Sequence, residues 1–234
     1  MDFALMTTAA GIGIFHTAIG VDHYVPFVAM SKANGWSFAK TMVVVFVCGA
    51  AHVLSSIILG LCGILLGSQV SSLIGIQDFR GEVAVWFLIA FGAVYMLWGI
   101  RNAVRNRPHK HVLTDGKEVW HNHDAVHGRE CGDEHSERTG VSRSFWPLFI
   151  LFVLGPCELL IPLLMFPAAQ GGMMSVIAVA AVFAFCTVGT MLVCAGVVLK
   201  GIDMIPAKKI ERYSHSLAGF AVLMCGLAIQ FLGI

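Results

Sequence analysis

Long apolar runs separated by short polar connections make up most of this chain. A helix needs about 20 mostly apolar residues to cross the hydrocarbon core of a bilayer. The first run is long enough to tilt, or to break near Gly20 and Pro26. The runs predict six transmembrane helices, at Ala4–Met30, Lys40–Gly67, Gly81–Ala103, Ser144–Ala168, Met173–Lys200 and Tyr213–Leu232.

A single long polar segment divides these helices into two sets of three. We predict a first three-helix repeat over 1–103, a cytoplasmic His-rich loop over 104–143 and a second three-helix repeat over 144–234. Because three is odd, the two halves enter the membrane from opposite sides, as in an inverted repeat. A glycine, a polar pair and a proline occur in both Gly20–Pro26 and Gly155–Pro162. The predicted fold is therefore an all-α membrane protein with two inverted three-helix repeats.

The composition agrees with a membrane protein whose surroundings are the lipid bilayer. Hydrophobic residues make up 57% and charged residues 12% of the chain, whereas a soluble domain carries roughly 25% charged residues. The net charge of +1 gives no indication of a nucleic-acid partner. The amino terminus lacks the basic region and cleavage site of a secretory signal peptide, so we expect the first apolar run to be retained.

Basic residues gather in the first, third and fifth connections, and only Arg80 falls on the opposite side. Cytoplasmic loops carry an excess of lysine and arginine. We therefore predict a multi-pass protein of the cell (inner) membrane with both termini outside and the 104–143 loop in the cytoplasm.

The first apolar run contains three ionisable residues, His16, Asp22 and His23. Such residues are costly at membrane depth and mark substrate or ion paths, and imidazole with carboxylate suits a divalent transition metal. On an unbroken helix the two histidines share a face and lie about 10.5 Å apart along the axis. Either the helix unwinds near Gly20, or the histidines are successive stations on a path. The structural alternative is a pair hydrogen-bonded to a neighbouring helix.

Three further residues in apolar runs are candidate ligands. His52 lies midway along the second run among small residues, which allow another helix to approach closely. It is either a metal ligand or a histidine that donates to a carbonyl across the bundle. Cys157 and Glu158 lie between Pro156 and Pro162 in the fourth run. Glu158 could complete a metal site or carry a coupled proton, and Cys157 could offer a thiolate or simply pack as a small hydrophobe.

The polar loop holds six histidines mixed with acidic residues. Histidine-rich tracts are typical of metal capture, and a cytoplasmic metallochaperone is a candidate partner there. The alternative is a solvated linker, as the polar composition allows. The histidines are His109, His111, His121, His123, His127 and His135.

The pattern His16-x-x-x-Gly20-x-Asp22-His23 resembles the signature of the HupE/UreJ family of nickel permeases, although Thr17 stands where that family usually has proline. It is also similar to the NicO nickel/cobalt transporters, whose histidine and Asp-His pair are one residue closer and which often carry a histidine-rich loop. Pro156-Cys157 with Pro162 resembles the Pro-Cys motif of the CcdA/DsbD electron carriers and the related sulfite-exporter-like (TauE/SafE) proteins.

Together these observations predict a transporter rather than an enzyme. Its substrate would be a divalent transition metal ion (nickel, cobalt or zinc, with nickel or cobalt as first candidates), bound by His16, Asp22, His23, His52, Cys157 and Glu158. The first alternative is a CcdA/DsbD-like thiol-disulfide electron carrier, which needs Cys157 beside Cys48 or Cys62. A second is an exporter of a small sulfur-containing anion, which favours basic residues at membrane depth; the sequence predicts that lysines and arginines stay at helix ends.

Overall fold

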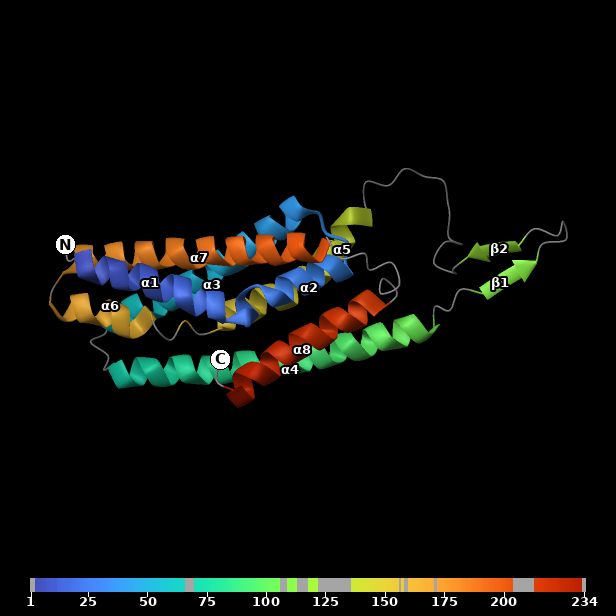
Figure 1. Cartoon of the computed structure of the whole chain (residues 1–234). Helices are drawn as coiled ribbons and strands as arrows, with labels where there is room; N and C mark the ends of the chain where they lie inside the picture. Colours follow the sequence, from blue (N-terminus) through green and yellow to red (C-terminus); the bar gives the residue numbers. More distant parts are fainter. Residues whose placement is uncertain are drawn as a thin grey trace.

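The computed structural model describes residues 3–65, 70–105, 109–112, 118–121, 136–155, 157, 160–170, 172–203 and 213–232. In this part of the chain, helices of very different length form an elongated bundle (Figure 1). The elements are α1 (Phe3–Ile19), the short 3-10 helix η1 (Val21–His23), α2 (Val25–Ala33), α3 (Phe38–Leu65), α4 (Val70–Arg105), β1 (His109–Val112), β2 (Glu118–His121), α5 (Ser136–Leu154), α6 (Leu160–Ala169), α7 (Met173–Asp203) and α8 (Ser214–Leu232).

Four of the described helices are long and apolar enough to cross a membrane on their own, namely α3, α4, α7 and α8. A fifth span results if α1 and the segment from η1 through α2, which bend by 83° at their junction, are counted together. These helices make the chain a multi-pass membrane protein. The predicted span Ser144–Ala168 is not one long helix, because it is divided between α5 and α6.

Helix α4, which corresponds to the third predicted span, is longer than predicted. It begins at Val70 rather than Gly81 and has 36 residues, which correspond to about 54 Å of helix. A hydropathy window stops at Gly81 because Asp78, Arg80 and Glu82 interrupt the apolar run. The backbone nevertheless stays helical through these charges, since their side chains find positions at the surface or against neighbouring helices.

The first apolar run breaks at Gly20, as one of the two sequence-based alternatives anticipated. The final helical hydrogen bond at the end of α1 runs from the Gly20 N–H to the His16 carbonyl, at 2.9 Å. A Cβ at Gly20 would lie 2.6 Å from the His23 Nδ1 atom, so only glycine fits at this bend. The chain then restarts as η1 and α2, with Pro26 in the first turn of α2, where a missing N–H costs nothing.

The fourth apolar run breaks after Leu154 for a reason visible in the sequence. A helix continuing past Leu154 would need the N–H of residue 156 to bond the Phe152 carbonyl, and residue 156 is a proline. The last bond of this turn runs from the Gly155 N–H to the Leu151 carbonyl, at 2.8 Å. The break therefore leaves carbonyl groups of α5 that other parts of the protein must satisfy.

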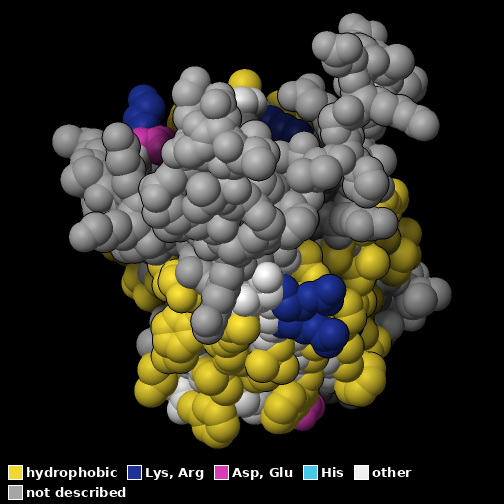
Figure 2. Space-filling model, turned by 90° about the vertical axis from the view of Figure 1, so that its right-hand side faces the viewer, with side chains coloured by type: hydrophobic (Ala, Val, Ile, Leu, Met, Phe, Trp, Pro, Cys, Tyr) yellow, Lys and Arg dark blue, Asp and Glu magenta, His cyan; other side chains and the backbone are white. Residues whose placement is uncertain are grey.

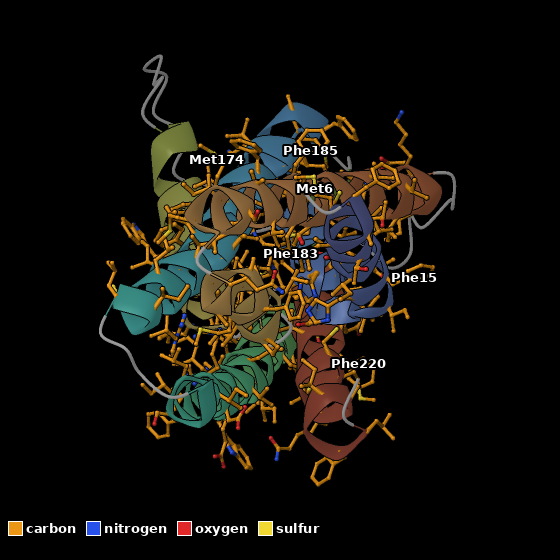
Figure 3. The ribbon with its side chains drawn as sticks, turned by 90° about the vertical axis from the view of Figure 1, so that its left-hand side faces the viewer. Met6, Phe15, Met174, Phe183, Phe185 and Phe220 are labelled. Atoms are coloured by element: carbon orange, nitrogen blue, oxygen red, sulfur yellow. The ribbon has the colours of Figure 1, made fainter. Side chains whose placement is uncertain are left out.

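Most helices pack around two clusters of buried apolar side chains. One cluster joins α2, α3, α4, α5, α7 and α8 and includes Phe27, Leu148 and Met191. The other joins α1, α3, α6 and α7 and includes Phe183 and Leu164. Figure 3 shows Phe183 inside the bundle, whereas Phe15, Phe185 and Phe220 point outward, as expected of residues that face lipid.

Helices α4 and α8 lie side by side along one flank of the bundle (Figure 1). Four glycines line their contact, each seven residues from its partner on the same helix. A Cβ at Gly92 would lie 2.5 Å from the Leu223 backbone nitrogen, and one at Gly219 would lie 2.3 Å from that of Met96. Small residues at such seams allow backbones to touch. The two helices therefore form one closely packed pair, with the glycine set Gly92, Gly99, Gly219 and Gly226.

The two strands of the predicted polar loop are the main departure from an all-helical fold. They pair antiparallel, with His109 opposite His121 and Val112 opposite Glu118. Figure 2 views the molecule from the end that carries this hairpin and shows lysine and arginine side chains there. Among the described residues, the basic side chains near this end of the helices are Lys32, Lys40, Arg101, Arg105 and Lys200.

The α4–α8 contact predicts that Gly92→Ala destabilises the protein. The added methyl meets the backbone of α8 and forces the helices apart, at a cost of about 1–3 kcal/mol. Gly75→Ala is the matched control on the same helix, because a Cβ at Gly75 has open space around it. Thermal unfolding in detergent should show a lower Tm for the first variant alone; equal Tm values would contradict the close contact.

Candidate metal site

The break at Gly20 brings three histidines together. The ring centroids of His16 and His23 are 5.0 Å apart, and those of His23 and His52 are 5.5 Å apart. On an unbroken helix the first pair would be separated by about 10.5 Å along the axis. The bend therefore answers the question that the spacing left open: the helix unwinds, and its two histidines join a third from α3 in one cluster.

His23 is held by its own turn. Its Nδ1 atom lies 3.2 Å from the Gly20 carbonyl oxygen and 3.1 Å from Asp22 Oδ1. Both oxygens are acceptors, so Nδ1 carries the proton and donates to them. His23 is 4% exposed, whereas the Asp22 side chain is about one-third exposed. Asp22 thus orients the His23 imidazole by accepting a hydrogen bond from Nδ1, as carboxylates do for histidines that bind a metal through their other nitrogen.

His52 is held by the broken end of α5. Its Nδ1 atom donates to the Phe152 carbonyl at 3.1 Å, which is the carbonyl whose helical partner would be the proline at 156. The sequence allowed either a donor to a carbonyl across the bundle or a metal ligand. The hydrogen bond confirms the first role and leaves the second open, because it uses only one of the two ring nitrogens.

For His23 and His52 these bonds decide which ring nitrogen has a lone pair available for a ligand. A neutral imidazole that donates from Nδ1 has its lone pair on Nε2. Within the described part of the chain, the Nε2 atoms of His16, His23 and His52 are all buried and have no hydrogen-bond partner. Buried polar atoms are normally paired. Three such atoms in one cluster, unpaired among the described residues, make it a candidate binding site for a ligand that accepts nitrogen lone pairs.

A cavity of about 780 Å³ opens beside the cluster. The three histidines and Asp22 line it together with residues of α4 and Ile229 of α8. Apolar side chains such as Ile12, Phe15 and Leu151 make up much of the remaining lining. A small ligand in this cavity would thus meet polar groups of the histidine cluster and the two carboxylates of Asp78 and Glu82 on α4.

The cluster is not arranged as a finished coordination sphere. Among the residues that the structure describes, no three of His, Cys, Asp and Glu converge on one metal position. The rings of the adjacent pairs meet nearly edge to face, at 81° and 88°. Directing all three Nε2 atoms at one ion would require side-chain rotation.

Cys157, another predicted ligand, is not part of this arrangement, and Glu158 cannot be placed in it. Cys157 is fully buried in the apolar cluster with Val53, Leu160 and Leu164, and it does not line the cavity. Glu158 lies outside the described residues, as do His123, His127 and His135 of the predicted loop. His109, His111 and His121 lie on β1 and β2, and only their backbone is described.

Arg80 corrects one expectation from the sequence. It was predicted to lie in a connection, but it is the eleventh residue of α4. Its guanidinium donates to the Val153 carbonyl at 2.7 Å and to the Ser55 hydroxyl at 3.1 Å. Val153 follows Phe152 at the broken end of α5, so Arg80 satisfies the second of two freed carbonyls. The prediction that basic residues stay at helix ends is therefore wrong for Arg80.

Arg80 is predicted to stabilise the broken end of α5. Arg80→Met leaves the Val153 carbonyl without its donor, which costs about 1–3 kcal/mol. Arg101→Met is the matched control, because Arg101 is exposed on the same helix. Thermal unfolding in detergent should show a lower Tm for Arg80→Met only. If both variants unfold like the wild type, the bond to Val153 makes no contribution to stability.

Comparisons of the chain with protein-family models, with curated proteins and with solved structures give no match. Its function must therefore be argued from the site itself.

Proposed function

We propose that this protein carries a divalent transition metal ion, nickel or cobalt first among the candidates, across the membrane through the histidine cluster. The observation that carries the proposal is the set of three buried Nε2 atoms, from His16, His23 and His52, that lack hydrogen-bond partners among the described residues beside a common cavity. Neutral imidazole is a preferred ligand of nickel, copper and zinc. The donor set therefore matches a borderline metal better than calcium or magnesium, which take oxygen ligands.

In the proposed bound state the three imidazoles rotate so that their Nε2 atoms face one ion. Asp22 stays behind His23 as its hydrogen-bond acceptor and supplies negative charge at the site. That charge offsets part of the ion's double positive charge, which matters more in a low-dielectric interior than in water. Cys157 has no place in this site, because it is buried away from the cavity.

The architecture that we propose is six spans in two inverted halves, over 1–103 and 144–234, joined by the loop at 104–143. In this scheme, α1 with α2 and α5 with α6 are equivalent broken spans. Support comes from the 83° bend at Gly20 and from the two short apolar segments Phe145–Leu154 and Leu160–Ala169. Broken helices in corresponding positions of two repeats are typical of binding sites near the middle of transporters.

The proposed orientation has both termini outside and the hairpin end of the bundle in the cytoplasm of the cell (inner) membrane. It is supported by the basic residues at the ends of α2, α4 and α7 and at the start of α3. The histidines of the 104–143 loop would then collect the ion on the cytoplasmic side or meet a metallochaperone.

The thiol-carrier alternative has less support. It requires Cys157 close to Cys48 or Cys62. Cys48 belongs to the apolar cluster with Phe27 and Met191, whereas Cys157 belongs to the cluster with Phe183, and Cys62 is exposed. The anion-export alternative gains a basic residue in Arg80, but this guanidinium already donates to Val153 and Ser55.

Metal binding by the purified protein tests the proposal. We expect one nickel or cobalt ion per chain by elemental analysis, with binding weakened more than about 100-fold in His23→Ala or His52→Ala, which is beyond the effect typical of an outer-shell residue. Asp22→Asn should cost about 10- to 100-fold, because Asp22 orients His23. Transport into proteoliposomes should fall in the same order.

Two controls make this result interpretable. His215→Ala removes an imidazole that bonds Tyr95 far from the cavity, and it should leave the binding unchanged. Removal of residues 106–135, which lie between the end of α4 and the start of α5, should also keep the single tightly bound ion. Wild-type protein that binds no metal, or binding that survives His23→Ala and His52→Ala, would overturn the proposal.

The bend at Gly20 gives a separate prediction. Gly20→Ala places a methyl against the His23 Nδ1 atom, and the displaced ring should bind the ion about 10-fold more weakly or worse. Gly11→Ala on α1 is the matched control, because a Cβ there has open space. Isothermal titration with cobalt measures both. Equal affinities would mean that the position of the His23 ring is not important for binding.

A further inference from the structure

The cavity reaches the last turn of α8, where Ile229 lines it. The contacts between α4 and α8 run antiparallel, with Gly92 against Leu223 and Met96 against Gly219. Continued to the last residue of α8, Leu232, this register reaches Val83 of α4. From there towards Val70, α4 extends beyond its partner (Figure 1). The stretch of α4 that borders the cavity at this point carries two acidic residues.

These residues, Asp78 and Glu82, are a pair on one face of α4. They are four residues apart, which places them one above the other on a helix, and both line the cavity. Both side chains are exposed, and neither forms an ion pair within the described part of the chain. Arg80 lies between them in sequence, but it faces α3 and α5 through its bonds to Ser55 and Val153.

Two like charges at this spacing repel each other. With no counter-ion among the described residues, the pair is more stable with a cation bound between its carboxylates. This argument alone would not indicate a site, because exposed acidic residues are often only solvated. A second observation on the same cavity supports a binding role for the pair.

The second observation is on the inner wall. His23 and His52 line the same cavity, each is 4% exposed, and within the described residues each has a buried Nε2 atom without a partner. The cavity thus leads from exposed carboxylates to buried imidazoles. Carboxylate oxygens suit an ion that keeps much of its water, whereas imidazoles suit a transition metal that has lost it.

We propose that Asp78 and Glu82 form an outer binding station that captures a hydrated divalent cation and passes it to the histidine cluster. The inference rests on the proposed function and names the route to that site. Clefts lined by one sign of charge raise the local concentration of the opposite ion and the rate at which it associates. The outer station therefore acts on the rate of metal capture, and the histidines determine how tightly the ion is finally held.

Stopped-flow binding of cobalt to the full chain in a neutral detergent tests this assignment. The variant is Asp78→Asn/Glu82→Gln, and the control is Asp203→Asn, whose carboxylate pairs with Lys32 at the far end of the bundle. At low salt we expect the association rate constant of the double variant to fall about 10-fold or more, in the range of electrostatic steering. At about 1 M salt, where the screening length is about 3 Å, the variants should converge.

Two further measurements separate capture from folding and from the inner site. The double variant should still bind one cobalt ion per chain at saturation, and the charge-preserving exchange Asp78→Glu/Glu82→Asp should restore the rate. An association rate equal to that of the control at low salt would overturn the outer station alone. Loss of the stoichiometric ion in the double variant would overturn it too, since the carboxylates would then belong to the inner site. Wild-type protein that takes up no cobalt would overturn both the outer station and the proposed function.

Discussion

The carbonyl groups freed where two helices break are the constraint around which the candidate site is built. In a membrane every backbone polar group must find a partner inside the protein, and each break leaves carbonyls that no helical N–H can reach. At the end of α5 the imidazole N–H of His52 fills this role at the Phe152 carbonyl. At the first break the Gly20 carbonyl accepts the backbone N–H of His23 and, in addition, its imidazole N–H. The same bond that satisfies the backbone fixes the proton on Nδ1. As a result Nε2 is left as a lone-pair donor that faces the interior.

Because the same bonds tie the helices together, the site and the fold cannot be separated. His52 and Arg80 connect α3 and α4 to consecutive carbonyls at the end of α5. Helix α4 is in turn joined to α8 by backbone contacts along the glycine seam, where little sliding is possible. A movement of α4 that widens the cavity would therefore carry α8 with it and strain the bonds from Arg80 to Val153 and Ser55. A rocking motion of these two helices against the histidine wall is the simplest way in which this bundle could change access to its cavity.

The sequence predicts the parts of this arrangement that depend on local chemistry. Hydropathy locates α3, α7 and α8 to within a few residues, because the bilayer imposes their length and composition. In the first apolar run, Gly20 together with His16 and His23, which are energetically costly at membrane depth, indicates a possible break. The long-range parts are not visible in the sequence. The hydropathy pattern begins the third span at Gly81 and so places Arg80 in a connection. Nothing in the local sequence reveals the Val153 carbonyl that accepts the hydrogen bond from Arg80. The closeness of α4 to α8 is similarly hidden, because glycines seven apart have no distinctive local pattern. For the same reason the sequence does not single out Asp78 and Glu82 on α4, because their role depends on a cavity made by five other segments.

Under the proposed function, the ion is cargo, and the open arrangement of the histidine cluster then has a physical role. A structural zinc site is closed, with four ligands already in place and the charge of the ion largely compensated. Here three neutral imidazoles and one carboxylate would leave a divalent ion with a net positive charge, and the rings must rotate to meet it. Both features weaken binding and make release possible. A carrier needs affinity sufficient to desolvate the ion and low enough to let it go. The edge-to-face rings of His16, His23 and His52, each free at Nε2 among the described residues, satisfy that requirement better than a preformed sphere would.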